Sequence, residues 1–114
     1  MLDGKFKIEL LDQGREMCVN FGFIEAIEGR TPRRPIMALL NEAMIGEAFH
    51  TDIIEAFYLG LRSNNDKRLS LKEIGDAVVT GGIGNYYKLY LNMLTYALTG
   101  NTELETEKSF NKKK

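Results

Sequence analysis

The sequence contains few of the residues that mark disulfide, metal or membrane chemistry. Its single cysteine, Cys18, excludes an internal disulfide and a cysteine-ligated zinc site. There is no tryptophan and there are only two prolines, so no proline-rich linker divides the chain. Basic residues number 15 and acidic residues 16, and the net charge of −1 provides no field that would attract nucleic acid or an anionic membrane. No apolar run approaches the length of a transmembrane helix, which needs about 20 residues.

The remaining composition is typical of one globular domain. Hydrophobic residues make up 44% and charged residues 27% of the 114 positions, which is ordinary for a folded chain with one core. We predict a single domain over residues 1–100 and a flexible charged tail over residues 101–114, where Leu104 and Phe110 are the only apolar side chains. The first residues contain no apolar stretch that resembles a signal peptide, so we expect a cytoplasmic protein.

The first twenty residues predict a β-hairpin. Apolar Phe6, Ile8 and Leu10 alternate with charged residues, the period of two that is typical of a half-buried strand. Asp12-Gln13-Gly14 is the expected turn, since glycine adopts the positive φ that short hairpin loops need. Residues 16–19 would form the return strand.

From Asn20 onward the pattern is helical. Asn20 is a favourable N-cap, Pro32 and Pro35 suit a helix start, and Ser70 with Glu73 forms a capping box. The apolar spacing predicts helices that begin near residues 20, 36, 51, 70 and 84, the last of them ending at Gly100. We therefore expect an α+β fold, mostly helical, with an N-terminal β-hairpin followed by about five helices.

Catalytic residues are scarce, and we expect no enzyme and no cofactor. His50 is the only histidine, and no nucleophile motif surrounds it. Cys18 lies in an apolar strand pattern, so we expect a buried and unreactive thiol. The helical carboxylates have no apolar setting that would raise a pKa, and we interpret them as solvated; they are Glu25, Glu28, Glu42 and Glu47.

Two segments resemble ligand-binding motifs. Residues 62–73 partly fit a twelve-residue calcium loop, but Arg62 stands at its first position and Lys67 at the sixth, where aspartate and glycine are expected. A calcium-linked helical module is therefore a minor alternative, and we predict no metal ligand. The glycines around Ile83 lack the strand and the Gly-Lys-Ser/Thr sequence of a phosphate loop, so we interpret them as a helix break.

Two clusters of basic residues favour an alternative reading, a small nucleic-acid-associated regulatory protein that uses loop arginines. The clusters are Arg30, Arg33 and Arg34, and Arg62, Lys67 and Arg68. A nucleic-acid-binding module usually has a basic surplus along one element, and this chain has none. We therefore consider nucleic acid an unlikely partner.

The tyrosines near the C-terminus form the most unusual local pattern. Tyr86, Tyr87 and Tyr90, with Leu94 and neighbouring apolar residues, cover more than half the circumference of the last predicted helix. Such a helix can pack on the core with its tyrosine hydroxyls in solvent. A face this wide also favours a contact with a partner or a second copy of the chain. Tyr86, Tyr87, Tyr90 and Leu94 are our candidate partner-binding residues.

Four stretches of the sequence resemble the tail assembly chaperones of long-tailed bacteriophages and gene transfer agents. They are residues 4–8, residues 20–29, residues 54–62, and the segment Leu69-Ser70-Leu71-Lys72-Glu73-Ile74-Gly75 that follows a polar loop. The resemblance covers about residues 4–100 and consists of helix and cap patterns. It implies a protein without an active site.

The resemblance implies a function in phage or prophage tail assembly. Members of the family act in the cytoplasm of the bacterial host, coat the tape measure protein and recruit tail tube subunits, and they are not part of the mature particle. A homo-oligomer is a further possible assembly, which the wide face of the last predicted helix favours. Many members exist in a short form and a frameshifted longer form, and the codons of Lys112-Lys113-Lys114 are compatible with such a site. Simple solubilisation by a lysine-rich terminus is the alternative.

Overall fold

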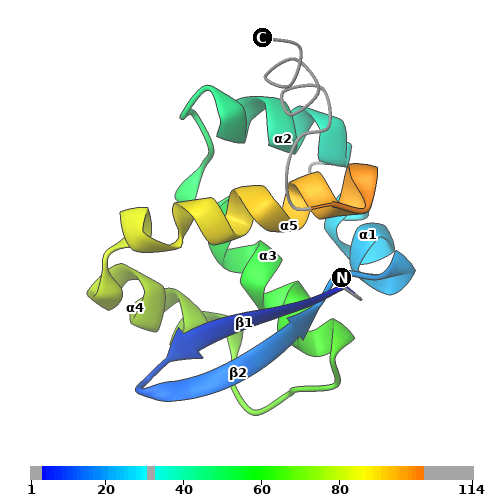
Figure 1. The fold of residues 1–114 in the computed structure, drawn as a ribbon. Helices are drawn as coiled ribbons and strands as arrows, with labels where there is room; N and C mark the ends of the chain where they lie inside the picture. The colour runs from blue at the N-terminus through cyan, green and yellow to red at the C-terminus, as the bar shows by residue number, and fades with distance from the viewer. Residues whose placement is uncertain (1–3, 31–32, 102–114) are drawn as a thin grey trace, which may run out of the picture.

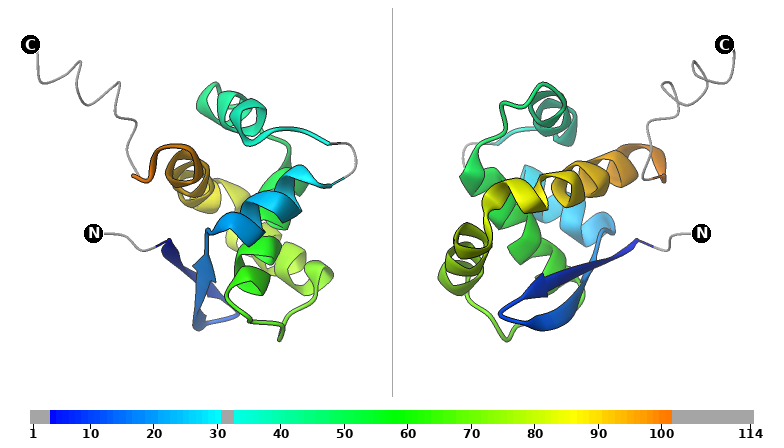
Figure 2. Two further views of the ribbon diagram at one scale, coloured as in Figure 1. Left: turned by 90° about the vertical axis from the view of Figure 1, so that its right-hand side faces the viewer. Right: turned by 60° about the vertical axis from the view of Figure 1, so that its left-hand side comes forward.

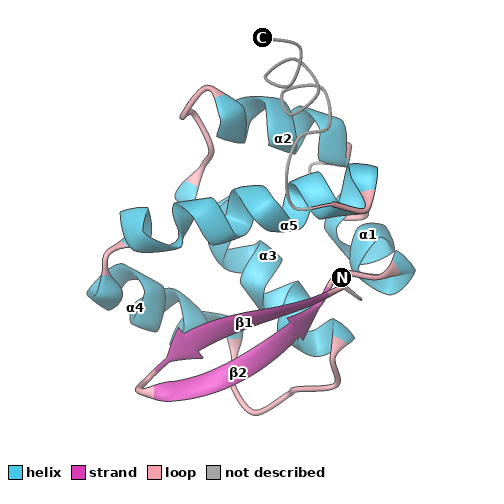
Figure 3. Cartoon of the chain, viewed as in Figure 1, coloured by secondary structure: helices cyan, strands magenta, loops and turns pink. Residues whose placement is uncertain are grey.

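The protein, described here by a computed structural model for residues 4–30 and 33–101, consists of a β-hairpin and five α-helices (Figure 1 and Figure 3). This confirms the predicted α+β, mostly helical fold. The predicted tail lies outside the described residues except for Asn101. The elements are β1 (Lys5–Leu10), β2 (Gln13–Cys18), α1 (Phe21–Glu28), α2 (Ile36–Met44), α3 (His50–Ser63), α4 (Leu71–Gly81), the 3₁₀ helix η1 (Ile83–Tyr86) and α5 (Tyr87–Thr99).

The hairpin forms as the alternating pattern predicts, but its turn begins one residue before the predicted turn at residues 12–14. The strands are antiparallel, with Leu10 opposite Gln13 and Gly14 opposite Glu9. The loop is therefore Leu11–Asp12, with φ angles of 56° and 59°. Two-residue hairpin turns that match the twist of the strands require positive φ at both loop residues. The expectation that Gly14 supplies the positive φ was wrong, because the strand pairing extends through Gly14.

The predicted caps are present at two helices. The Asn20 side chain accepts a hydrogen bond from the Phe23 backbone N–H at 2.9 Å. Ser70 accepts from the Glu73 backbone N–H at 3.1 Å, and the Glu73 carboxylate accepts from the Ser70 backbone N–H at 2.8 Å. The last predicted helix, expected from about residue 84, is split: residues 83–86 form the 3₁₀ turn η1, and α5 begins only at Tyr87.

Helix α5 crosses the middle of the molecule. Figure 1 and the right-hand view of Figure 2 show α2 on one side of α5 and the hairpin on the other. Helix α2 packs mainly on α5, whereas α3 contacts β2, α1, α4 and α5. Helices α1, α2 and α4, the 3₁₀ helix η1 and the hairpin thus pack around α3 and α5, which form the centre of the fold.

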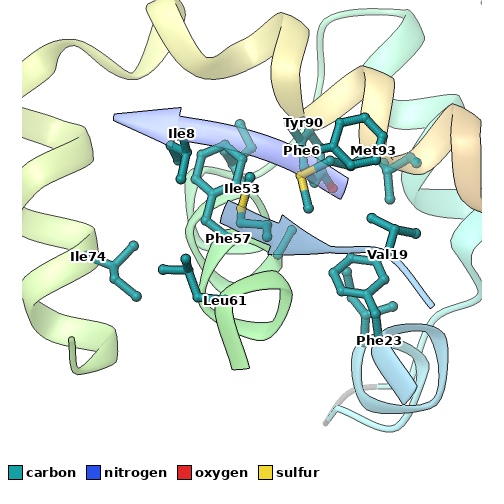
Figure 4. Packing of buried hydrophobic residues seen from close by; sticks show 14 of the residues in the cluster. Phe6, Ile8, Val19, Phe23, Ile53, Phe57, Leu61, Ile74, Tyr90 and Met93 are labelled. Atoms are coloured by element: carbon teal, nitrogen blue, oxygen red, sulfur yellow. The ribbon is translucent and has the colours of Figure 1, made fainter. Parts of the chain in front are cut away.

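The core lies where the hairpin meets α3 and α5 (Figure 4). Phe6, Phe57, Tyr90 and Met93 point into it from three different elements, and all are buried. Gly60 of α3 allows the close approach, because a Cβ there would lie 3.0 Å from the Met17 Cβ and 3.1 Å from the Met93 Cε.

Candidate functional site

Two of the four predicted partner-binding residues belong to the core. Tyr90 and Leu94 are both 0% exposed. Within the part of the chain that the structure describes, the Tyr90 hydroxyl has no hydrogen-bond partner, and burial raises its pKa well above the usual range. The expectation that Tyr90 and Leu94 lie on a contact surface is therefore corrected: neither side chain can be reached unless the domain opens.

Tyr86 and Tyr87 are half-buried and tie α5 to its neighbours. The Tyr86 hydroxyl donates to the Glu9 backbone carbonyl of β1 at 3.3 Å. The Tyr87 hydroxyl donates to the Ala43 carbonyl of α2 at 2.7 Å. Both residues keep part of their surface in solvent, so their role in binding a partner stays a prediction.

The wide apolar face of α5 has a structural cause. Helices α2 and α3 pack against α5, and Tyr86 just before it reaches the hairpin. A helix with neighbours on several sides needs apolar residues around most of its circumference. The breadth of this pattern therefore follows from the central position of α5 and does not require a partner.

Exposed apolar side chains gather instead on α2 and the segment after it. Four of the nine large apolar side chains that the described residues expose lie there, and we call them the α2 apolar surface: Met37 (53% exposed), Met44 (50%), Ile45 (68%) and Phe49 (61%). Met37 and Met44 are seven residues apart, so they lie on one side of the helix. Flexible methionines adapt to varied apolar partners.

Sequence reasoning did not find this surface. Met44 follows Leu40 at a helical spacing of four, yet it is half exposed, and the buried stripe of α2 consists of Ile36, Leu39, Leu40 and Ala43. Met37 lies off that stripe, and its spacing of seven from Met44 was the available signal. Exposure of Ile45 and Phe49 depends on the path of the α2–α3 loop, which no local pattern indicates.

Helix α2 is held in place by contacts from distant residues. The Glu28 carboxylate of α1 accepts a hydrogen bond from the Ile36 backbone N–H at 2.9 Å, which satisfies a donor at the start of α2. At the other end, Ala43 accepts from the Tyr87 hydroxyl. Glu28 was expected to be solvated, and its capping role is a correction. The exposed face of α2 is thus presented by a fixed helix.

A charge network around Asp52 joins this helix to α3. The Asp52 carboxylate, 8% exposed, pairs with Arg30 at 3.0 Å and with Arg34 at 2.9 Å. Arg34 also pairs with Glu42 of α2, and Arg30 with Glu55 of α3 at 2.8 Å. Burial acts to lower the pKa of Arg30, but its bonds to Glu55 and Asp52 outweigh this and raise it.

The ion pairs of the arginines weaken the alternative that this protein binds nucleic acid through its loop arginines. Arg30 and Arg34 are turned toward three carboxylates, so two members of the first basic cluster do not present their charge to a phosphate backbone. In the second cluster, Arg62 lies over the Tyr58 ring at 4.7 Å and Arg68 pairs with Asp66 at 2.8 Å. Neither cluster forms a continuous basic stripe.

The two motif-like segments have structural explanations. In the 62–73 loop, Asp66 is bound by Arg68, and the described residues contain no group of three histidine, cysteine, aspartate or glutamate side chains placed to hold a metal ion. The glycine segment ends α4 and leads into η1, as predicted. His50 is the exposed first residue of α3, and Cys18 is a buried free thiol, as expected.

Comparison of the chain with protein-family models, curated proteins and solved structures finds no match. Within residues 4–30 and 33–101, no helix has both the length and the apolar character needed to cross a bilayer. On the surface of the described residues, exposed large apolar side chains are most concentrated at the α2 apolar surface.

Proposed function

We propose that this protein is a non-enzymatic tail assembly chaperone of a phage, prophage or gene transfer agent. It binds the tape measure protein in the bacterial cytoplasm, recruits tail tube subunits and is left out of the mature particle. The sequence resemblance is one support for this proposal. The hairpin followed by five helices is compatible with it.

The α2 apolar surface is the observation that carries the proposal. Four large apolar side chains, each at least half exposed, lie within thirteen residues. Concentrated exposed apolar side chains usually mark a site of interaction. A tape measure protein is a long helical chain whose amphipathic face would aggregate if left uncovered. An amphipathic helix buries such a face by lying against apolar side chains on a partner.

The anchoring of α2 suits this role. Glu28, Tyr87 and the Asp52 network fix the helix on the domain before any partner arrives. A preformed surface loses little conformational entropy on binding, which leaves more of the contact free energy for affinity. We propose that copies of the chain bind along the tape measure through this surface and leave the opposite, hairpin side for tail tube subunits or for one another.

The direct experiment is co-expression of the full chain with its tape measure protein, followed by co-purification. We expect a soluble complex with the wild type. Ile45→Ser and Phe49→Ser together should lower recovery of the complex at least tenfold, because two well-buried apolar contacts contribute about 3 kcal/mol or more. Val79→Ser is the matched control, since Val79 is 63% exposed but lies on α4.

Failure to form a complex while the domain is folded would contradict the chaperone proposal. Equal loss with Val79→Ser would contradict the assignment to the α2 apolar surface. Tyr90→Ser is unsuitable as a probe, because Tyr90 is fully buried and its truncation would unfold the domain.

A further inference from the structure

A hollow of about 700 Å³ lies between the hairpin and the α3–α4 loop. Four cationic side chains line it, and two acidic ones; these are Lys7, Arg15, Lys67 and Arg68, with Glu16 and Asp66. The chain as a whole has a net charge of −1. The hollow is thus a local concentration of positive charge on an acidic protein, and its size is that of a small-ligand site.

Arg15 is the unusual member of this group. Its side chain is only 5% exposed, and it occupies a strand position opposite Ile8, on the side of β2 that faces the core. One guanidinium nitrogen, Nη2, donates to Gln13 Oε1 at 2.8 Å. The other two nitrogens, Nε and Nη1, are buried and have no hydrogen-bond partner among residues 4–30 and 33–101.

The nearest carboxylate does not complete these bonds. Asp66 Oδ2 forms an ion pair with Arg15 Nη1 at 3.8 Å, a distance too long for a hydrogen bond. Both Asp66 oxygens are already occupied by Arg68, which donates from Nε at 3.0 Å and from Nη2 at 2.8 Å. A buried guanidinium with two unmade hydrogen bonds costs stability, and this fold keeps one in the wall of a basic hollow.

The two lysines of the hollow also have unused capacity. Neither Lys7 nor Lys67 takes part in an ion pair or a side-chain hydrogen bond within the part of the chain that the structure describes. Together with Arg15 they supply three positive charges and several donors from β1, β2 and the α3–α4 loop. Positive side chains that separate elements contribute to the lining of one hollow are a common arrangement for binding an oxyanion.

We infer that this hollow binds the phosphate group of a small phosphorylated ligand, with Lys7 and Lys67 as its exposed donors and Arg15 as the buried cation behind them. The lining has four basic and two acidic side chains, a surplus of two positive charges. This surplus matches the charge of a phosphate dianion better than that of a single carboxylate. The site lies on the hairpin and the α3–α4 loop, apart from the α2 apolar surface. The inference does not rest on the proposed function.

The test is a titration of the full chain with inorganic phosphate, followed by amide NMR signals at constant ionic strength. Saturable shifts of Lys7, Arg15 and residues 64–68 are expected. Lys67→Ala and Lys7→Ala should each weaken binding about threefold to fivefold, the effect of one partly exposed charge pair. Lys88→Ala, which removes the same charge from an exposed position on α5, should leave binding unchanged.

Arg15→Met separates ligand binding from folding. The substitution keeps an apolar stem and removes a buried guanidinium whose Nε and Nη1 make no hydrogen bond within the described residues, while Asp66 keeps its bonds to Arg68. The domain should therefore unfold at the same or a higher urea concentration while phosphate binding is lost. Shifts that do not saturate, or that sodium chloride reproduces, would overturn the inference. Undiminished phosphate binding by Arg15→Met would also overturn it. The same holds if the wild-type chain binds tetraglutamate as tightly as it binds phosphate or adenosine monophosphate.

Discussion

Among the described residues, Arg15, Arg62 and Tyr90 have buried polar atoms without a hydrogen-bond partner, and Arg15 and Tyr90 show how much the surroundings of such an atom matter. Tyr90 supplies a large ring to the core and its hydroxyl contacts no acceptor. Arg15 places a guanidinium on the core side of a strand and leaves two nitrogens unbonded. The difference lies in their surroundings, because the Arg15 side chain lines a basic hollow and Tyr90 is enclosed by helices. We assign a ligand to Arg15 and only a packing role to Tyr90.

Removing the Tyr90 hydroxyl should therefore stabilise the domain. Tyr90→Phe keeps the buried ring and eliminates a hydroxyl that lost its hydrogen bonds to water on folding. We expect the free energy of unfolding, measured by urea denaturation, to rise by about 1 kcal/mol. A fall of similar size would show that the hydroxyl is satisfied in the folded protein.

Asp66 should make the domain sensitive to acid. Hydrogen bonds from Arg68, opposed by burial and helped by the charges of Arg68 and Arg15, lower the pKa of Asp66 from 3.8 to about 2. Because this folded-state pKa lies below the unfolded value, the carboxylate stabilises the fold above about pH 4, and this stabilisation is lost as the pH falls toward 2. Asp66→Asn should give a shallower decline in unfolding free energy over that interval; parallel pH profiles would contradict this.

At the scale of elements, the packing of α3 depends on the absence of a side chain at Gly60. This glycine lies where α3 touches Met17 of β2 and Met93 of α5. With glycine at position 60, α3 approaches the hairpin and α5 more closely than it could with any other residue at this position. Gly75 of α4 is different, since a Cβ there would meet only Ile54 at an ordinary 3.5 Å.

We expect the substitution of alanine at Gly60 and at Gly75 to change the free energy of unfolding in opposite directions. Gly60→Ala should lower the free energy of unfolding by about 1 kcal/mol, because overpacking at the Met17 contact exceeds the gain in helix propensity. Gly75→Ala should raise it by about 1 kcal/mol, since alanine favours the helix and fits the space. Urea denaturation of both variants tests the pair. A stabilising Gly60→Ala would show that Met17 and Met93 move aside without cost.

Over the whole molecule, Asp52 connects segments that are distant in the sequence. It binds Arg30 after α1 and Arg34 before α2, and Arg34 in turn binds Glu42. Helices α1, α2 and α3 are thereby fixed relative to one another. The orientation of the α2 apolar surface depends on this network.

Asp52→Ala should therefore be strongly destabilising. It leaves two partly buried guanidinium groups without their shared carboxylate, which should cost about 3 kcal/mol of unfolding free energy. The control is Lys72→Ala, which breaks an exposed pair with Asp76 on α4 and should change stability by no more than about 0.5 kcal/mol. Similar small effects in both variants would refute a structural role for the network.

The sequence predicts the local structure of this protein better than its surface. The hairpin, the caps at Asn20 and Ser70 and the helical order follow from spacing and residue type over a few positions. The burial of Tyr90 and the pairing of Arg34 with Asp52 depend on segments that meet only in the folded chain. For the same reason, the sequence pointed to the tyrosine-rich last helix as the contact surface, whereas the structure exposes apolar side chains on α2.

The chaperone account rests on contact between the α2 apolar surface and the tape measure protein, and methionine methyl NMR tests that contact directly. Met37 and Met44 are half exposed, whereas Met17 and Met93 are fully buried and serve as internal references. On addition of a soluble tape measure fragment, we expect the methyl signals of Met37 and Met44 to shift or broaden and those of Met17 and Met93 to stay in place. Unchanged signals from Met37 and Met44 in a saturated complex would contradict the account.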